Sequence, residues 1–254
     1  MSVKFRALIL AAPGARGLEE FEEALNTTGF EPEILSVDQL IEAKLDHEQL
    51  CLKYKLLIIP GGNTYASVMG GGKILSLKIS HALGWDLNRF AERGGLVLGV
   101  GTGLEALLHL NCFGNDYAFR ANDSAAYSET WMKVTPIGNR CIWLRGIGTM
   151  ELPMNQLETI FVIDPFAYVE AKGRLERLGL NCLMLEGSSF KVGTESVVGL
   201  CDSTGRIFGI LPHPEFFLSW TSTEDWVSNP TRAAAPGQGL ALFENAMKAA
   251  ASDI

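Results

Sequence analysis

The chain has 254 residues, of which 47% are hydrophobic and 20% charged, so it can bury a core and is not a disordered protein. Its 29 acidic and 21 basic side chains give a formal net charge of −8, which argues against nucleic acid as a partner because phosphate binding needs clustered Lys and Arg. The five cysteines form no CxxC pair and the four histidines are scattered, so we expect no disulfides, no metal site and no cofactor.

The chain begins with two basic residues, Lys4 and Arg6, followed by an apolar run at 7–12. This run is short for the core of a secretory signal and suits a strand that is buried on both faces. No apolar run in the sequence approaches the roughly 18 residues that a membrane helix needs. We therefore expect a cytoplasmic protein without a membrane partner.

From this first strand to residue 110, predicted strands and helices alternate. Apolar runs predict strands at 6–12, 34–37, 56–59 and 96–100. Helical spacing of apolar residues predicts helices at 18–28, at about 38–45 with Asp38 as the cap, at about 74–93, and at 102–110. This βαβ rhythm is typical of a parallel sheet with helices on both faces.

The second half of the chain has a different pattern. Strand-forming residues with polar interruptions at 117–147 predict an antiparallel excursion, and 196–211 predicts a hairpin with its turn at 202–205. We expect a long surface loop at 216–236, whose Trp220 and Trp226 pack locally, and an amphipathic helix at 239–250. The predicted fold is a single α/β domain over residues 1–254, with a mostly parallel sheet and an antiparallel insertion in its second half.

The most informative segment is the predicted strand, turn and helix at 96–107, which contains Gly99, Gly101 and Gly103. Such a turn directs the free N–H groups of the helix toward whatever lies above the sheet, which favours an anion or a developing oxyanion. A tight turn without a ligand is the simplest alternative. A further interpretation is a nucleophile elbow, G-x-Nuc-x-G, in which Gly99 and Gly103 flank Gly101 at the nucleophile position.

Two nucleotide-binding patterns in the same region are incomplete. A dinucleotide motif that starts at Gly99 needs a glycine where the chain has Leu104. A P-loop near 70–73 has Ser67 in place of its first glycine and Ile74 in place of the Ser or Thr that binds magnesium. Both departures argue against nucleotide binding, although an unrelated task on the same fold stays open.

Four segments of the chain match, in order, the motifs of a known enzyme family. Residues 60–65 resemble P-G-G-F-S-Y, residues 97–103 resemble V-L-G-I-C-N-G, residues 122–131 are similar to N-x-S-x-R-F-x-x-R-W, and residues 206–215 match G-R-V-x-x-L-M-P-H-P-E. These motifs are those of the class I glutamine amidotransferases, and most closely of the glutaminase component of phosphoribosylformylglycinamidine synthase. The resemblance covers most of the chain.

The resemblance implies a flavodoxin-like, three-layer fold and hydrolysis of the side-chain amide of glutamine. In such enzymes a thiolate attacks the amide, a histidine acts as base and then as acid, and a carboxylate orients the histidine. By the match, His213 is the base and Glu215 is its orienting partner. Two backbone N–H groups hold the oxyanion, here expected at Thr102 and near Gly62. The implied substrate-binding positions are Gly61, Gly62, Thr102, Asn122, Ser124 and Glu158.

The chain departs from the family at the reacting group, because Gly101 stands where the family has its cysteine. Loss of a triad nucleophile lowers turnover by roughly a millionfold in hydrolases. Thr102 is a poor replacement because its side chain should point away from the elbow. Cys112 is equally poor, because it lies about 16 Å further along the predicted helix.

Other family positions differ as well. In the stretch that resembles H-G/A-E-G only Glu158 is kept and Gln156 replaces the histidine, while Ala126 and Thr130 replace two arginines. We therefore predict a glutaminase-like protein related to purine biosynthesis that has lost hydrolysis and acts as a binding or regulatory subunit. Its expected partners are a synthase subunit and glutamine or a related carboxylate or amide. The alternative is an active amidotransferase component that supplies ammonia through an unanticipated nucleophile. Because several positions differ, Gly101→Cys alone is expected not to restore full activity.

Overall fold

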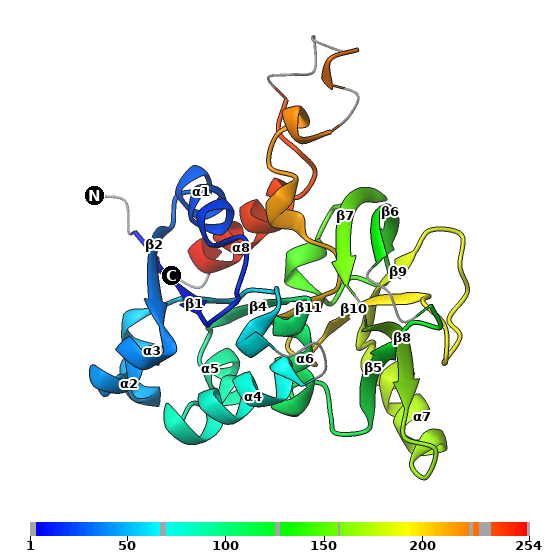
Figure 1. The fold of residues 1–254 in the computed structure, drawn as a ribbon, viewed down its shortest axis with the longest axis horizontal. Helices are drawn as coiled ribbons and strands as arrows, with labels where there is room; N and C mark the ends of the chain where they lie inside the picture. The colour runs from blue at the N-terminus through cyan, green and yellow to red at the C-terminus, as the bar shows by residue number, and fades with distance from the viewer. Residues whose placement is uncertain are drawn as a thin grey trace.

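A single large sheet forms the centre of the computed structural model, which describes residues 4–66, 70–124, 128–156, 158–223, 226–228 and 235–252 (Figure 1). The sheet has nine strands in the order β2 (Glu31–Ser36), β1 (Arg6–Ala11), β3 (Leu56–Ile59), β4 (Leu96–Val100), β11 (Ile207–Ile210), β10 (Val197–Cys201), β9 (Asn181–Leu185), β6 (Ser128–Pro136) and β7 (Met150–Gln156).

The two halves of this sheet differ in strand direction. From β2 to β11 every neighbouring pair is parallel, and from β11 to β7 every pair is antiparallel. All residues of β3, β4 and β11 are buried, as is typical of parallel strands covered on both faces. A separate antiparallel pair consists of β5 (Tyr117–Ala121) and β8 (Glu158–Ile163). The predicted α/β class, with its antiparallel part in the second half, is confirmed.

Helices cover both faces of the parallel half (Figure 1). On one face lie α1 (Leu18–Thr28) and α8 (Leu240–Ser252), and on the other lie α4 (Gly71–Leu77), α5 (Leu87–Glu92) and α6 (Thr102–His109). The remaining helices are α2 (Val37–Glu42), α3 (His47–Lys53), α7 (Tyr168–Leu178), the π-helical turn η2 (Lys78–Ala82) and the short turns η1 (Thr64–Ala66), η3 (Ile142–Leu144), η4 (Pro214–Phe216) and η5 (Trp220–Ser222).

Two helix predictions were wrong in detail. The helix expected at 74–93 is divided into α4, η2 and α5, because Gly84 has a positive φ of 67° and Asp86 begins a new helix by accepting a hydrogen bond from the Arg89 N–H. The expected cap Asp38 lies inside the first turn of α2. Ser36 is the cap, in a reciprocal capping box with Gln39.

The end of the chain follows the prediction more closely. Strands β10 and β11 form the expected hairpin, and its turn is held by the Asp202 carboxylate, which accepts hydrogen bonds from the main chain of Thr204, Arg206 and Ile207. Trp220 packs against Phe217 with ring centroids 5.3 Å apart, which agrees with local packing. Trp226 is 46% exposed.

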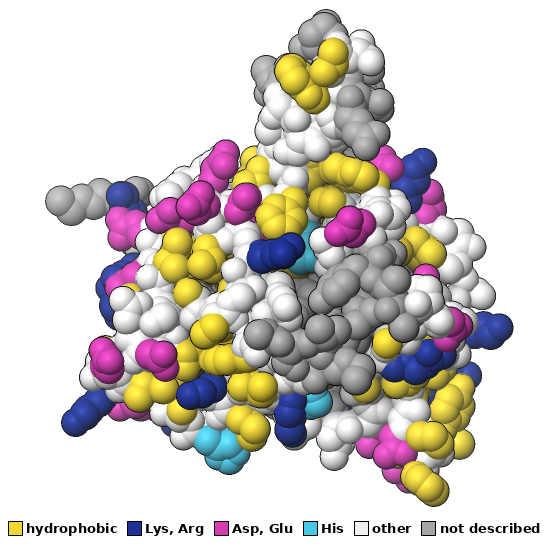
Figure 2. All heavy atoms as spheres, in the orientation of Figure 1, with side chains coloured by type: hydrophobic (Ala, Val, Ile, Leu, Met, Phe, Trp, Pro, Cys, Tyr) yellow, Lys and Arg dark blue, Asp and Glu magenta, His cyan; other side chains and the backbone are white. Residues whose placement is uncertain are grey.

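Charges are mixed over the molecular surface. Figure 2 shows Lys and Arg side chains scattered among acidic ones on the face drawn, with acidic side chains gathered over α1, whose first turn carries Glu19 and Glu20. Among the described residues, no helix is both long enough and apolar enough to cross a membrane.

Candidate active site

The connection from β4 to α6 turns at Gly101, which has φ 52° and ψ −114°. This positive φ is a conformation that glycine adopts easily and other residues adopt only with strain. The turn is held by two main-chain hydrogen bonds. The Gly101 N–H donates to Ile210 of β11 at 2.8 Å, and the Gly101 carbonyl accepts from the Glu105 N–H at 3.2 Å. The chain therefore has the backbone geometry of an elbow at the carboxyl end of a central strand.

The three glycines of this turn differ in how much room their surroundings leave for a side chain. A Cβ on Gly103 would lie 2.0 Å from the carbonyl oxygen of Ile59, and a Cβ on Gly99 would lie 2.6 Å from Leu107. Close packing of α6 on the sheet excludes side chains at both positions. A Cβ on Gly101 would meet nothing nearer than the Gln156 Oε1 at 3.1 Å. Room for a side chain at the apex would therefore require only that the flexible end of Gln156 shift by a few tenths of an ångström, which favours the elbow over a tight turn without a function.

His213 and Glu215 lie beside this apex. The Nδ1 atom of His213 is 2.8 Å from Oε1 of Glu215, and their side chains are only 6% and 1% exposed. The Cε1 atom of the same imidazole is 3.7 Å from the position of a Cβ on Gly101. The main-chain N–H of His213 donates to Pro153 of β7 at 2.7 Å, which attaches this segment to the antiparallel half of the sheet. Gly101, His213 and Glu215 therefore meet, as expected from the sequence.

Burial disfavours the charged form of the His213 ring and by itself lowers the pKa. The Glu215 carboxylate, its hydrogen bond and a backbone hydrogen bond at Asn155 outweigh burial, so the pKa of His213 is raised above its ordinary value. Arg16 opposes this increase because its positive charge lies close by. Glu215 contacts the ring and favours its charged form in the way a triad carboxylate does.

The loop after β3 closes the other side of the apex. A Cβ on Gly61 would lie 3.1 Å from the His213 ring, and the Gly61 carbonyl accepts a hydrogen bond from the Arg16 N–H at 3.0 Å. The Thr102 hydroxyl donates to the carbonyl of Gly62 at 2.7 Å, so this side chain points to the loop. Gly61, Gly62 and Thr102 thus come together around Gly101. Arg16 belongs to the same neighbourhood through its hydrogen bond to Gly61.

Gln156 and Glu105 complete the surroundings of the apex. The Gln156 Nε2 donates to the Glu105 Oε1 at 2.8 Å, and the Gln156 Oε1 points to the space beside Gly101. Sequence reasoning noted Gln156 only as a change from the family and did not identify Glu105. A signal was present, because Glu105 follows Gly101 by four residues and so lies on the same face of α6.

Two of the remaining predicted substrate-binding residues line another cavity. Asn122 and Ser124 lie in the wall of a cavity of about 570 Å³, together with Ile160, Thr194 and Glu195, and neither Gly101 nor His213 lines it. The main chain of Glu158 lies near Asn122, because Glu158 pairs with Ala121 at the end of β5. Ala126, Tyr127 and Leu157 lie outside the described residues.

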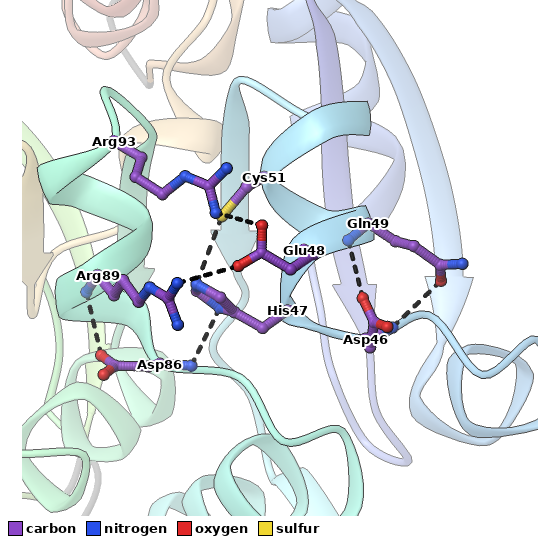
Figure 3. Close-up of polar contacts among 8 residues, drawn as sticks. All are labelled: Asp46, His47, Glu48, Gln49, Cys51, Asp86, Arg89 and Arg93. Carbon is purple, nitrogen blue, oxygen red and sulfur yellow. Dashed lines mark hydrogen bonds and ion pairs between the residues drawn. The ribbon is translucent and has the colours of Figure 1, made fainter.

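Four of the cysteines are buried, and Cys51 on α3 is half-buried. Figure 3 shows Cys51 beside His47, with its Sγ 3.5 Å from the His47 Nε2. The Asp86 N–H donates to the His47 Nδ1 at 3.3 Å, so the Nε2 carries the ring proton and cannot accept one from the thiol. Burial also raises the pKa of the Cys51 thiol, although Arg93 works in the opposite direction. This pair therefore lacks the properties of an activated nucleophile.

Within the described residues, no group of three or more His, Cys, Asp or Glu side chains is arranged to hold a metal ion. The groups that surround the apex are protein side chains and main-chain N–H groups. They comprise an oriented histidine, the N–H groups at the start of α6, where no side chain caps the helix, and a residue 101 without a side chain.

Known proteins resemble this chain over nearly its whole length. A relative from Methanococcus maripaludis, named phosphoribosylformylglycinamidine synthase subunit PurQ, is 27% identical over 267 residues, covering 96% of this chain and 97% of that protein. A protein of the same name from Dehalococcoides mccartyi is 27% identical over 264 residues, with coverage of 96% and 97%.

Solved structures share the fold. The structure of PurLQS from Thermotoga maritima contains a chain that superposes with a TM-score of 0.71 at 21% identity, covering 97% of this chain and 99% of that one. A glutamine amidotransferase from the same organism gives a TM-score of 0.56 at 12% identity, covering 99% and 98%. The family described as CobB/CobQ-like glutamine amidotransferase domain matches residues 4–175 and 192–248. The elbow, the oriented histidine and this match agree, and the chain belongs to the CobB/CobQ-like glutamine amidotransferase domain family.

Proposed function

We propose that this protein is a glutaminase-like subunit related to phosphoribosylformylglycinamidine synthase that no longer hydrolyses glutamine. One observation carries the proposal. The elbow apex, where the family's cysteine is expected, is Gly101, while a buried and oriented histidine still faces that position. Without a thiolate no bond can form to the amide carbon of glutamine, and the first step of hydrolysis is lost.

The parts that remain suit binding rather than turnover. His213 keeps a raised pKa and its hydrogen bond to Glu215, but it has no thiol proton to accept. The start of α6 offers N–H groups to a carbonyl or carboxylate oxygen. A pocket of this kind is compatible with glutamine or a related small carboxylate or amide as a ligand.

The relatives suggest the partner. Two of them are named as synthase subunits, and the similar solved chain belongs to a structure named PurLQS. We propose that this chain also acts as a subunit of such a synthase. Its role there is to bind or regulate rather than to supply ammonia.

The alternative, an active glutaminase that uses another nucleophile, receives less support. Among the described residues, those that contact His213 or act on its charge include Glu215, Asn155, Pro153, Arg16 and Phe216, none of which carries a thiol. Burial raises the pKa of the Cys112 thiol well above its ordinary value, which makes that group unreactive.

The direct test incubates the purified chain with glutamine, alone and with a synthase partner, and measures ammonia and glutamate. We expect no release above that of a His213→Ala control, because loss of a triad nucleophile lowers turnover by roughly a millionfold. Release well above the control in either condition would overturn the proposal. Covalent labelling with a glutamine-analogue electrophile, followed by mass spectrometry, would then identify the nucleophile.

A further inference from the structure

The space in front of residue 101 is occupied by a side chain of the protein itself. A Cβ at Gly101 would be 3.1 Å from the Gln156 Oε1, nearer than the Gly61 Cα or the His213 Cε1, which are both at 3.7 Å. A cysteine sulfur would lie one bond further out. The carboxamide of Gln156 therefore borders the volume in which a nucleophile, and the amide under attack, would have to meet.

A hydrogen bond to Glu105 holds the Gln156 side chain in this position. Its Nε2 donates to the Glu105 Oε1 at 2.8 Å, and the side chain is buried, with the residue only 5% exposed. A carboxylate only accepts hydrogen bonds, so Glu105 takes the NH₂ group and turns the amide oxygen toward residue 101. A hydrogen bond to a charged group is stronger than one between neutral groups.

Glu105 is itself confined. It lies in the first turn of α6 against α4, where a Cβ on Gly72 would be 2.5 Å from the Glu105 Cβ and 3.0 Å from its Oε2. Gln156 ends β7, where it pairs with Ser128 of β6. Both partners are thus positioned by secondary structure rather than by loops.

We propose that Gln156 is an internal occupant of the glutamine position, and that Glu105 is the latch that holds it there. The inference rests on the proposed function and identifies the side chain that blocks the site. The protein presents to its own elbow the functional group that a free glutamine would bring. With glycine at 101 this carboxamide cannot be hydrolysed, and it competes with free glutamine for the same place.

The test places a thiol at residue 101 and measures whether Gln156 slows its reaction with a glutamine analogue. Gly101→Cys, Gly101→Cys with Gln156→Ala, and Gly101→Cys with Glu151→Ala are treated with the glutamine analogue 6-diazo-5-oxo-L-norleucine and, separately, with iodoacetamide. Glu151 is an exposed position on the same strand and serves as the matched control. Labelling rates are followed by intact mass, and folding is checked by circular dichroism and thermal unfolding.

We expect Gln156→Ala to speed labelling by the glutamine analogue by about tenfold or more. In this variant the hydrogen bond to Glu105 no longer holds a carboxamide beside the thiol. Labelling by iodoacetamide should change much less, and Glu151→Ala should leave both rates unchanged. An unchanged analogue rate in the folded double variant overturns the inference. An equal rise with both reagents also overturns it, because Gln156 would then cover the thiol without occupying the glutamine position.

A second measurement uses neither the cysteine at residue 101 nor the alanine at residue 156. Binding of glutamine is measured by calorimetry for the unmodified chain, for Glu105→Gln and for Gln156→His. Glu105→Gln should bind glutamine more tightly, by about tenfold, because the charge-assisted hydrogen bond that holds Gln156 becomes one between neutral groups. Gln156→His should also bind glutamine more tightly, because no carboxamide of the protein then competes for the same place. Equal affinity in all three chains contradicts the inference and leaves the proposed function standing. Hydrolysis by the unmodified chain would instead defeat the proposed function.

Discussion

The turn between β4 and α6 and the end of β7 meet beside Gly101, but they are constrained in different ways. In the turn, main-chain packing determines the residues, since side chains at Gly99 and Gly103 would overlap Leu107 and the Ile59 carbonyl. At the end of β7, the Gln156 side chain donates a hydrogen bond to Glu105. The comparison teaches that the turn is determined by main-chain packing that the fold itself requires, whereas the side chains beside it are held by polar contacts between separate elements.

The largest expected effect tests the packing side of this comparison. Gly103→Ala should destabilise the fold by about 3 kcal/mol, because the new methyl would overlap the Ile59 carbonyl 2.0 Å away and α6 would have to move. Gly173→Ala, in α7 with open space around it, is the matched control and should stabilise the fold by about 0.5–1 kcal/mol. Urea unfolding of both variants measures the difference. Similar stabilities would show that the elbow is not held by packing.

A smaller effect is expected at the apex. Gly101→Ala should cost about 1–2 kcal/mol, because residue 101 keeps a positive φ of 52° that alanine adopts only with strain. The nearest atom is the end of the flexible Gln156 side chain, which can move away. The same unfolding measurement applies, and a loss as large as that of Gly103→Ala would mean that residue 101 has no room for a side chain.

The smallest effect concerns protonation. The pKa of His213 is raised in the folded chain, so its contribution to stability is complete below the ordinary histidine value of about 6.5 and is lost as the pH rises through the folded value. We expect the free energy of unfolding to fall over that interval. Glu215→Gln should reduce the fall by removing the carboxylate that favours the charged ring. An NMR titration of the His213 ring provides the pKa directly, and a lowered value would contradict the sign of the effect.

Much of the fold could be predicted because strong local patterns coincide with it. The predicted ranges 18–28, 56–59 and 96–100 have the bounds observed for α1, β3 and β4. The division of the 74–93 helix was missed, because apolar spacing continues through Gly84 and Asp86 although the backbone turns there. Helical periodicity reports which residues face the core and does not report where a new axis begins.

The residues of the candidate site also divide into those that the sequence could identify and those that only the structure shows. His213 and Glu215 could be identified because they are two residues apart in one motif, and Gly101 because it stands between two glycines of a strand–helix turn. The contact of Gln156 with Glu105 joins residues that are 51 positions apart in different elements. Asn122 and Ser124 matched a family motif but line a cavity bordered by neither Gly101 nor His213.

The amino-acid sequence alone determined that this chain is a parallel α/β protein with an elbow whose apex carries no side chain, because buried strands and glycine turns depend on neighbouring residues. Only the tertiary structure decided what occupies the space at that apex. Strand β7 comes from the antiparallel half and α6 from the parallel half, and long-range pairing alone brings the Gln156 amide to Glu105 beside Gly101.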